Sequence, residues 1–206
     1  SSTSAFDVRK GSVSAKLGGG VGLNKTTADM VTLSGANSYT GTTTVSAGTL
    51  ALGHASDTLP DAGAVTVAGG TLNVGFADTV GVVTMSSGAI TGAGTLTGTS
   101  FGFSGGTSST HLAGPLTVSG AVGLSGTLSG SATVDTGGTL TLGASDVIVD
   151  GNTVVVQGGG TLALGGYSDT VGAVQLIDGA ITGTGGTLSS TSAFDVRKGS
   201  VSAKLG

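Results

Sequence analysis

Two pairs of carboxylates are the strongest candidates for chemistry in this 206-residue sequence. Asp57 and Asp61 are four residues apart, and Asp146 and Asp150 repeat that spacing. Enzymes that cleave polysaccharides use paired carboxylates as acid, base or nucleophile, so a glycosidase or lyase is the enzyme class to consider. Both pairs lie beside turn residues, where Asp is expected because its side chain hydrogen-bonds the local backbone. The sequence therefore favours a turn role for these four residues.

Residues 102–106 (GFSGG) have the G-x-S-x-G pattern of a hydrolase nucleophile elbow. That elbow needs a turn from a strand into a helix, and the glycine-rich surroundings predict no helix. His54 and His111 are the only histidines, and because His54 lies near Asp57 a Ser-His-Asp triad is conceivable. Neither histidine has an equivalent in the internal repeats, so we expect both in turns or on the surface, without a metal or other cofactor.

Composition excludes several other classes of protein. Glycine provides 42 of the 206 residues and charged residues only 9%, but the apolar content of 37% argues against disorder. Residues 26–196 contain no Lys or Arg, so no basic face is available to neutralise phosphates and a nucleic-acid partner is not expected. No run of eighteen apolar residues occurs, so this segment is not expected to insert into a membrane. The N-terminus lacks the apolar core of a signal peptide, which indicates an interior piece of a longer protein if the protein is secreted.

A long internal identity organises the chain. Residues 1–18, SSTSAFDVRKGSVSAKLG, recur unchanged as residues 189–206. An identity of this length does not arise by chance. We therefore interpret residues 1–188 as one full tandem-repeat unit of a continuous solenoid and residues 189–206 as the start of the next identical repeat.

An older duplication lies inside this unit. Residues 69–96 resemble residues 159–188, including the shared segments D-T-V-G and G-A-I-T-G. This similarity divides the unit into two divergent halves, about 1–97 and 98–188.

A finer period comes from seven Gly-Thr-Leu triplets, which begin at residues 48, 70, 94, 126, 138, 160 and 186. Most neighbouring triplets are 22–26 residues apart, and short apolar alternations such as Val65 and Val67 lie between them. Alternation with a period of two, bounded by Gly, Ser and Asp, indicates short strands. One coil cannot bury its apolar residues alone, so coils must stack. The sequence thus predicts an all-β fold, a parallel β-helix with 22–26 residues and three short strands per coil. About eight coils would then form each unit, with a length of ~40 Å.

Residues 33–53, LSGANSYTGTTTVSAGTLALG, resemble the autotransporter-associated β-strand repeat of large bacterial surface proteins. The positions that fit its pattern are Leu33, Gly35, Asn37, Tyr39, Gly41, Thr43, Val45, Gly48, Thr49 and Leu50. The resemblance implies a right-handed parallel β-helix that is exported from a Gram-negative-type cell and displayed outside it. It implies no catalytic residues, and we interpret Asn37 and Tyr39 as residues that stabilise a turn.

These observations lead to one main functional hypothesis and two alternatives. The main hypothesis is a rod- or fibre-forming repeat segment of a giant secreted or surface-displayed bacterial protein, without enzymatic activity. Its expected partners are neighbouring copies of the same repeat, stacked end to end within one chain or by self-assembly. The first alternative is an adhesin module for a host or polysaccharide ligand. The second is a β-helix enzyme that degrades polysaccharides through the two aspartate pairs.

Overall fold

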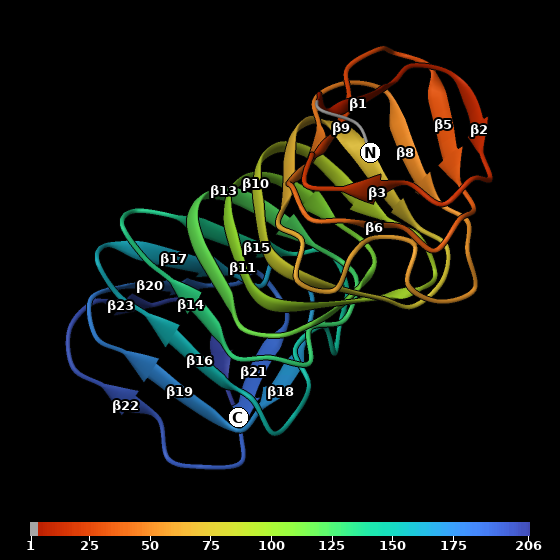
Figure 1. The fold of residues 1–206 in the computed structure, drawn as a ribbon. Helices are drawn as coiled ribbons and strands as arrows, with labels where there is room; N and C mark the ends of the chain where they lie inside the picture. Colours follow the sequence, from red (N-terminus) through yellow and green to blue (C-terminus); the bar gives the residue numbers. More distant parts are fainter. Residues whose placement is uncertain (1–3) are drawn as a thin grey trace.

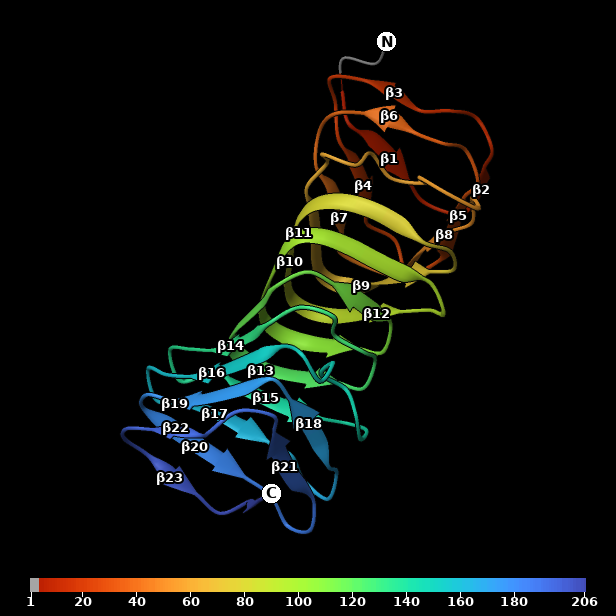
Figure 2. The same cartoon turned by 90° about the horizontal axis from the view of Figure 1, so that it is seen from below.

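The chain folds into a parallel β-solenoid. The computed structural model describes residues 4–206, and within this range the regular elements are strands, with no helix. The strands pair in parallel with strands of the preceding and following coils, and about eleven turns stack into an elongated rod (Figures 1 and 2). Within the described residues, no helix is long and apolar enough to cross a membrane. The predicted fold class is confirmed.

Each coil contributes to three faces of the rod. The first face contains β1 (Phe6–Val8), β4 (Leu23–Lys25), β7 (Thr43–Val45), β14 (Ala132–Val134), β16 (Thr153–Val156), β19 (Ala173–Leu176) and β22 (Asp195–Val196). The second face contains β2 (Gly11–Val13), β5 (Met30–Leu33), β8 (Thr49–Leu52), β15 (Thr139–Leu142), β17 (Gly160–Ala163), β20 (Gly179–Thr182) and β23 (Ser200–Val201). The third face contains β3 (Gly18–Gly19), β6 (Ser38–Tyr39), β12 (His111–Ala113), β18 (Asp169–Val171), β21 (Thr187–Ser190) and β24 (Lys204–Leu205).

Four longer strands occupy the middle of the rod and turn corners without a break. They are β9 (Val65–Val74), β10 (Asp78–Thr91), β11 (Thr95–Ser108) and β13 (Leu116–Leu124). Register shifts within β10 and β11 mark β-bulges, which let a strand bend from one face to the next. The middle coils therefore form the smooth bands seen in Figure 2.

The coils are shorter than the sequence predicted. One column of paired residues runs along the first face from Asp7 to Asp195. It passes through Asn24, Thr44, Thr66, Thr84, Gly102, Thr117, Thr133, Val155 and Gln175. These ten steps lead from one copy of the repeated segment to the same position in the next copy, with ~19 residues per coil. The tandem-repeat unit thus contains ten coils rather than about eight, and its axial length is ~48 Å rather than ~40 Å.

The Gly-Thr-Leu triplets gave the wrong period because they mark two different corners. Leu50 pairs with Leu72 on the second face, so the spacing of the triplets at 48 and 70 measures one true coil. Leu72 then pairs with Ile90, which belongs to no triplet and closes a shorter coil. Leu96 of the next triplet lies on the third face, where it pairs with Leu112. The triplets at 70 and 94 therefore lie on different faces, so the number of residues between them is not the length of a coil.

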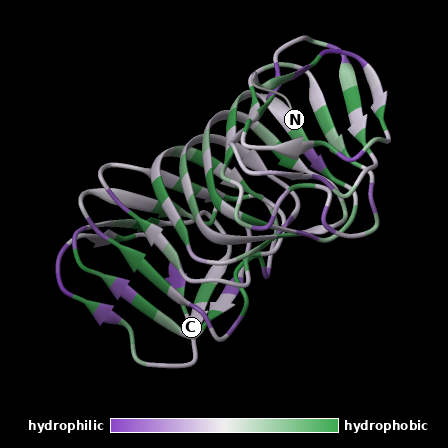
Figure 3. Cartoon of the chain, in the orientation of Figure 1, coloured by the Kyte–Doolittle hydropathy of each residue, from purple (hydrophilic) through white to green (hydrophobic). Residues whose placement is uncertain are grey.

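The core is a narrow column of aliphatic side chains. Inward residues alternate with outward ones along the strands, as in β9, and the buried positions are mostly Val, Leu and Ile. Figure 3 shows this alternation as green bands on otherwise pale strands. The rings of Phe101 and Phe103 add an edge-to-face pair in the middle of the rod, with centroids 5.9 Å apart. Because each inward side chain contacts the coils on either side, neighbouring coils stabilise one another.

Gly48 allows two coils to approach closely at a corner. It has a φ of +62°, and a Cβ at this position would collide with the carbonyl oxygens of Thr27 and Asp29 in the preceding coil. We expect Gly48→Ala to lower the free energy of unfolding by at least about 1–2 kcal/mol, because the left-handed conformation alone costs that much. Urea denaturation measures the effect. The matched control is Gly102→Ala, where a Cβ meets nothing within 4 Å; equal destabilisation of both variants would contradict this role.

Candidate functional site

The two aspartate pairs predicted from the sequence lie on exposed loops. Asp57 and Asp61 follow β8, and Asp146 and Asp150 follow β15. Asp57 and Asp146 have φ values of +52° and +53°, a left-handed conformation that Asp tolerates through local hydrogen bonds. The structure does not bring the two pairs together, because the loops lie on coils about five levels apart, which corresponds to ~24 Å along the rod.

Each of these loops is fixed by a buried carboxylate that the sequence analysis did not single out as a site. Asp78 and Asp169 are 3% and 1% exposed. Oδ2 of Asp78 accepts a hydrogen bond from the backbone N–H of Leu59 at 3.0 Å. Oδ2 of Asp169 accepts bonds from the N–H groups of Val147 and Ile148 at 2.9 and 3.0 Å. The second oxygen of each carboxyl is buried and has no hydrogen-bond partner among the described residues.

Burial changes the acidity of both groups. Loss of solvation, helped by the nearby charge of Asp57, raises the pKa of Asp78 to about 6, and the backbone donors oppose this rise. Burial likewise raises the pKa of Asp169 to about 6, with added repulsion from Asp146 and Asp150. The same local arrangement thus occurs twice in the rod, each time as a buried carboxyl under a loop that carries exposed carboxylates.

The residues of the conceivable Ser-His-Asp triad are separated. Ser104 lies inside β11 as an exposed strand residue, not on a strand-to-helix turn. The imidazole of His54 contacts the carbonyl oxygen of Ser56, and Nε2 of His111 lies 2.7 Å from Oγ of Ser129. Among the described residues, no group of three or more His or Asp side chains is arranged to hold a metal ion, and no pocket is found.

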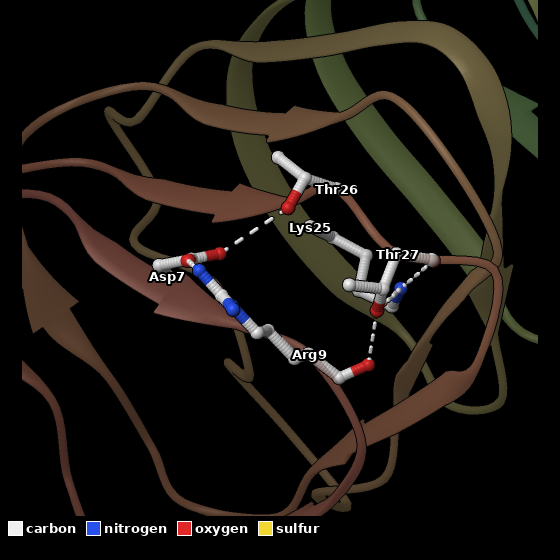
Figure 4. Close-up of polar contacts among 5 residues, drawn as sticks. All are labelled: Asp7, Arg9, Lys25, Thr26 and Thr27. Carbon is white, nitrogen blue, oxygen red and sulfur yellow. Dashed lines mark hydrogen bonds and ion pairs between the residues drawn. The ribbon is translucent and has the colours of Figure 1, made fainter.

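A polar cluster joins the first two coils (Figure 4). Lys25 is fully buried, and its Nζ donates to the carbonyl oxygen and Oγ1 of Thr27 and to the carbonyl oxygen of Ala47. Oγ1 of Thr27 also donates to the carbonyl oxygen of Arg9, and Oγ1 of Thr26 lies 3.3 Å from Oδ1 of Asp7. The ammonium group therefore satisfies backbone carbonyls at a corner, and the two threonines connect the first coil to the second.

The motif residues Asn37 and Tyr39 are also held between coils. Oδ1 of Asn37 accepts the N–H of Leu17 from the preceding coil at 2.9 Å, and its Nδ2 donates to the carbonyl of Thr58 in the following coil at 2.6 Å. Tyr39 is fully buried, and its hydroxyl lies 2.6 Å from Oγ1 of Thr43. Burial raises the pKa of Tyr39 to about 12. In this geometry both side chains are occupied by contacts within the rod.

Replacement of Asn37 should loosen three coils at once. We expect Asn37→Ala to lower the free energy of unfolding by about 2–3 kcal/mol, because the N–H of Leu17 and the buried carbonyl of Thr58 both lose their partner. Thermal denaturation measures the shift. The control is Asn73→Ala, which removes one hydrogen bond to Thr91 on the outer surface; a loss as large for Asn73 as for Asn37 would contradict the bridging role.

The parallel strand pairing and the stacked core define the chain as a β-solenoid. Residues 23–52 match the family described as passenger-associated-transport-repeat. This repeat is found in autotransporter passenger domains, which are secreted or surface-exposed. The β-solenoid therefore contains, at residues 23–52, a repeat of the kind found in autotransporter passenger domains, as the motif of residues 33–53 predicted. The comparisons with curated proteins and with solved structures returned no match.

Proposed function

We propose that this chain is a rod segment of a giant secreted or surface-displayed bacterial protein and serves as stalk, coat or extracellular filament. The observation that carries the proposal is the column from Asp7 to Asp195, in which the repeated segment returns to the same face after ten coils. A further unit in the same chain would continue the backbone ladder without a break. Each added unit would then lengthen the rod by ~48 Å.

The proposed mechanism is mechanical and not catalytic. Continuous parallel ladders and the aliphatic core couple each coil to its neighbours, so the rod resists local unfolding. Outward Thr side chains, such as Thr66 and Thr84 with hydroxyls 3.2 Å apart, give a polar surface of low charge. Two observations support a non-enzymatic role. His54 contacts the carbonyl oxygen of Ser56, and His111 contacts the hydroxyl of Ser129. The two aspartate pairs lie at exposed turn positions.

The rod function can be tested on living cells. Chains with one, two and three copies of the tandem-repeat unit are displayed on a Gram-negative cell from a common membrane anchor, with an epitope tag at the distal end. The tag height above the outer membrane should rise by ~48 Å with each unit. A tag height that does not change with the number of units would contradict a rod function.

A second candidate function, that of an adhesin, is favoured by two exposed aromatic residues. Phe76 and Tyr167 are 48% and 42% exposed and occupy equivalent positions just before the buried Asp78 and Asp169. The backbone of each packs tightly on a glycine of the next coil, because a Cβ at Gly94 or Gly186 would collide with it.

The two exposed aromatic residues lie about five coils apart, at ~24 Å. Binding to a polysaccharide panel that is lost in Phe76→Ala/Tyr167→Ala would support an adhesin. Absence of binding, or binding that survives the double replacement, would leave only the rod function.

A further inference from the structure

Two Asp-Gly dipeptides occur in the chain, at residues 150–151 and 178–179. In this dipeptide the aspartate side chain can react with the backbone, because glycine has no side chain to shield its nitrogen and gives the chain the most conformational freedom. The product is isoaspartate, in which the main chain runs through the former side chain. The reaction requires that the carboxyl group and the glycine nitrogen are both free to meet, so the folded structure decides which dipeptide reacts.

The first dipeptide lies on the loop between β15 and β16 (Figure 2). The N–H of Asn152 donates to the carbonyl oxygen of Val149 at 2.9 Å, so Asp150 and Gly151 are the two central residues of a tight turn. Both residues are exposed. Among residues 4–206, no backbone carbonyl accepts the N–H of Gly151 and no ion pair holds the carboxyl of Asp150. The two reacting groups of this dipeptide are therefore free.

The second dipeptide is held in place by its neighbours. The carbonyl oxygen of Asp178 accepts the N–H of Gly159 at 3.1 Å, and its carboxyl pairs with Lys198 at 3.2 Å. Gly179 is the first residue of β20 and pairs with Gly160 in the parallel ladder. The backbone and the carboxyl of this dipeptide are thus both engaged, although its sequence is the same.

We propose that Asp150 is a site of spontaneous isoaspartate formation. The nitrogen of Gly151 forms a bond to the side-chain carboxyl carbon of Asp150. The proton of that nitrogen and the hydroxyl group of the carboxyl leave as one water molecule, which closes a five-membered succinimide ring. A second water molecule then breaks one of the two carbonyl–nitrogen bonds of the ring. Cleavage at the former side chain restores aspartate, whereas cleavage at the main-chain carbonyl leaves isoaspartate of unchanged mass.

The first half of the tandem-repeat unit contains a matched turn. The N–H of Gly63 donates to the carbonyl oxygen of Pro60 at 2.8 Å, so Asp61 and Ala62 are the central residues of this turn. Both are exposed. The Cβ of Ala62 shields the nitrogen that would have to attack, so Asp61 should react more slowly. The chain therefore provides its own control in the same turn geometry.

The reaction has a structural consequence, because Gly172 of the following coil lies directly against the turn. A Cβ at Gly172 would be 2.5 Å from the carbonyl oxygen of Gly151, and the N–H of Gly172 donates to the carbonyl oxygen of Asn152 at 2.8 Å. Isoaspartate inserts one extra atom into the main chain just before Gly151, so the turn must move against a neighbour that leaves no space. The modification should loosen the contact between these two coils.

Prolonged incubation of the folded full chain at neutral pH tests the proposal. The chain is then unfolded and digested with an endoprotease that cleaves before aspartate but not before isoaspartate. Cleavage at Asp150 should be lost progressively, whereas cleavage at Asp61 and Asp178 should persist. Intact cleavage at Asp150, or an equal loss at Asp178, would overturn the proposal. Incubation in urea removes the protection by the fold, so cleavage at Asp178 should then be lost as well; its persistence would contradict that protection.

Two single replacements exchange the matched turns. Gly151→Ala should stop the reaction at Asp150 and keep the fold, because a Cβ there meets nothing within 4 Å. Ala62→Gly should create a new reactive site at Asp61. Circular dichroism verifies folding of both variants. Continued loss of cleavage at Asp150 in the first variant, or unchanged cleavage at Asp61 in the second, would overturn the proposal.

Hydrogen exchange measures the structural consequence. The amide of Gly172 should exchange faster in incubated chains than in fresh ones, and equal exchange would contradict a loosened contact between the coils. Isoaspartate formation depends on the fold alone and would occur whether or not the chain serves as a rod.

Discussion

Lowering the pH from 7.5 to 4.5 is expected to stabilise the protein, with a gain of about 4 kcal/mol from Asp78 and Asp169 together. Burial raises the pKa of each carboxyl to about 6 in the folded protein, above its ordinary value of 3.8. At pH 5 the folded protein therefore binds more protons than the unfolded chain. The contribution is fully present below about pH 4, falls as the pH rises through 6 and is absent above about pH 7.

The measurement is urea denaturation at constant ionic strength across this pH range. The double variant Asp78→Asn/Asp169→Asn provides the control, because the amide oxygen can still accept the N–H bonds of Leu59 and Val147 while the titration is removed. Its stability should vary little between pH 4.5 and 7.5. A native protein that loses stability between pH 7 and 5, or a double variant with an unchanged slope, would contradict the assignment of the buried carboxyls.

Phe101→Ala is expected to lower the free energy of unfolding by about 3–5 kcal/mol. Phe101 is 1% exposed in the middle of the rod, where its ring lies edge-to-face with Phe103 and close to Gly98 of the same strand and Gly114 of the next coil. The glycines have no side chains that could move into the space left by the ring, so most of the cavity would remain. The coils on both sides would lose contacts at once.

Phe76→Ala is the matched control for this replacement, because it removes the same ring from a site that is 48% exposed. Its effect should stay within about 0.5 kcal/mol. Hydrogen exchange of the amides in β10, β11 and β13 would localise the loss in Phe101→Ala to the middle coils. Equal effects at Phe76 and Phe101 would contradict a core made of stacked inward side chains.

Much of the fold could be predicted from the sequence because a solenoid repeats its local rules. Alternation such as Val65 and Val67 predicts short strands with one buried face, and both side chains are buried in β9. The coil length could not be read from the Gly-Thr-Leu triplets, because the same short sequence suits two corners. Only the pairing of Leu72 with Ile90 and of Leu96 with Leu112 separates the two faces.

The buried polar residues were harder to predict. Asp78 lies beside glycine-rich sequence and has the appearance of a turn residue. A signal was nevertheless present, because Asp78 is two residues before the buried Val80, and Asp169 stands in the same relation to Val171. The same rule places Lys25 on the inner side, two residues after Leu23. What the alternation cannot supply is the partner, since Leu59 and Ala47 come from other coils.

The tandem-repeat unit, residues 1–188, is expected to form a whole number of coils, so that successive units continue one rod. The most direct test is small-angle X-ray scattering and cryo-electron microscopy of a two-unit chain, built by adding residues 19–206 after residue 206. We expect one straight particle that is ~48 Å longer than the one-unit chain and has the same cross-section. Two bodies joined by a bend or a flexible junction, or an added length well below that of ten coils, would contradict it.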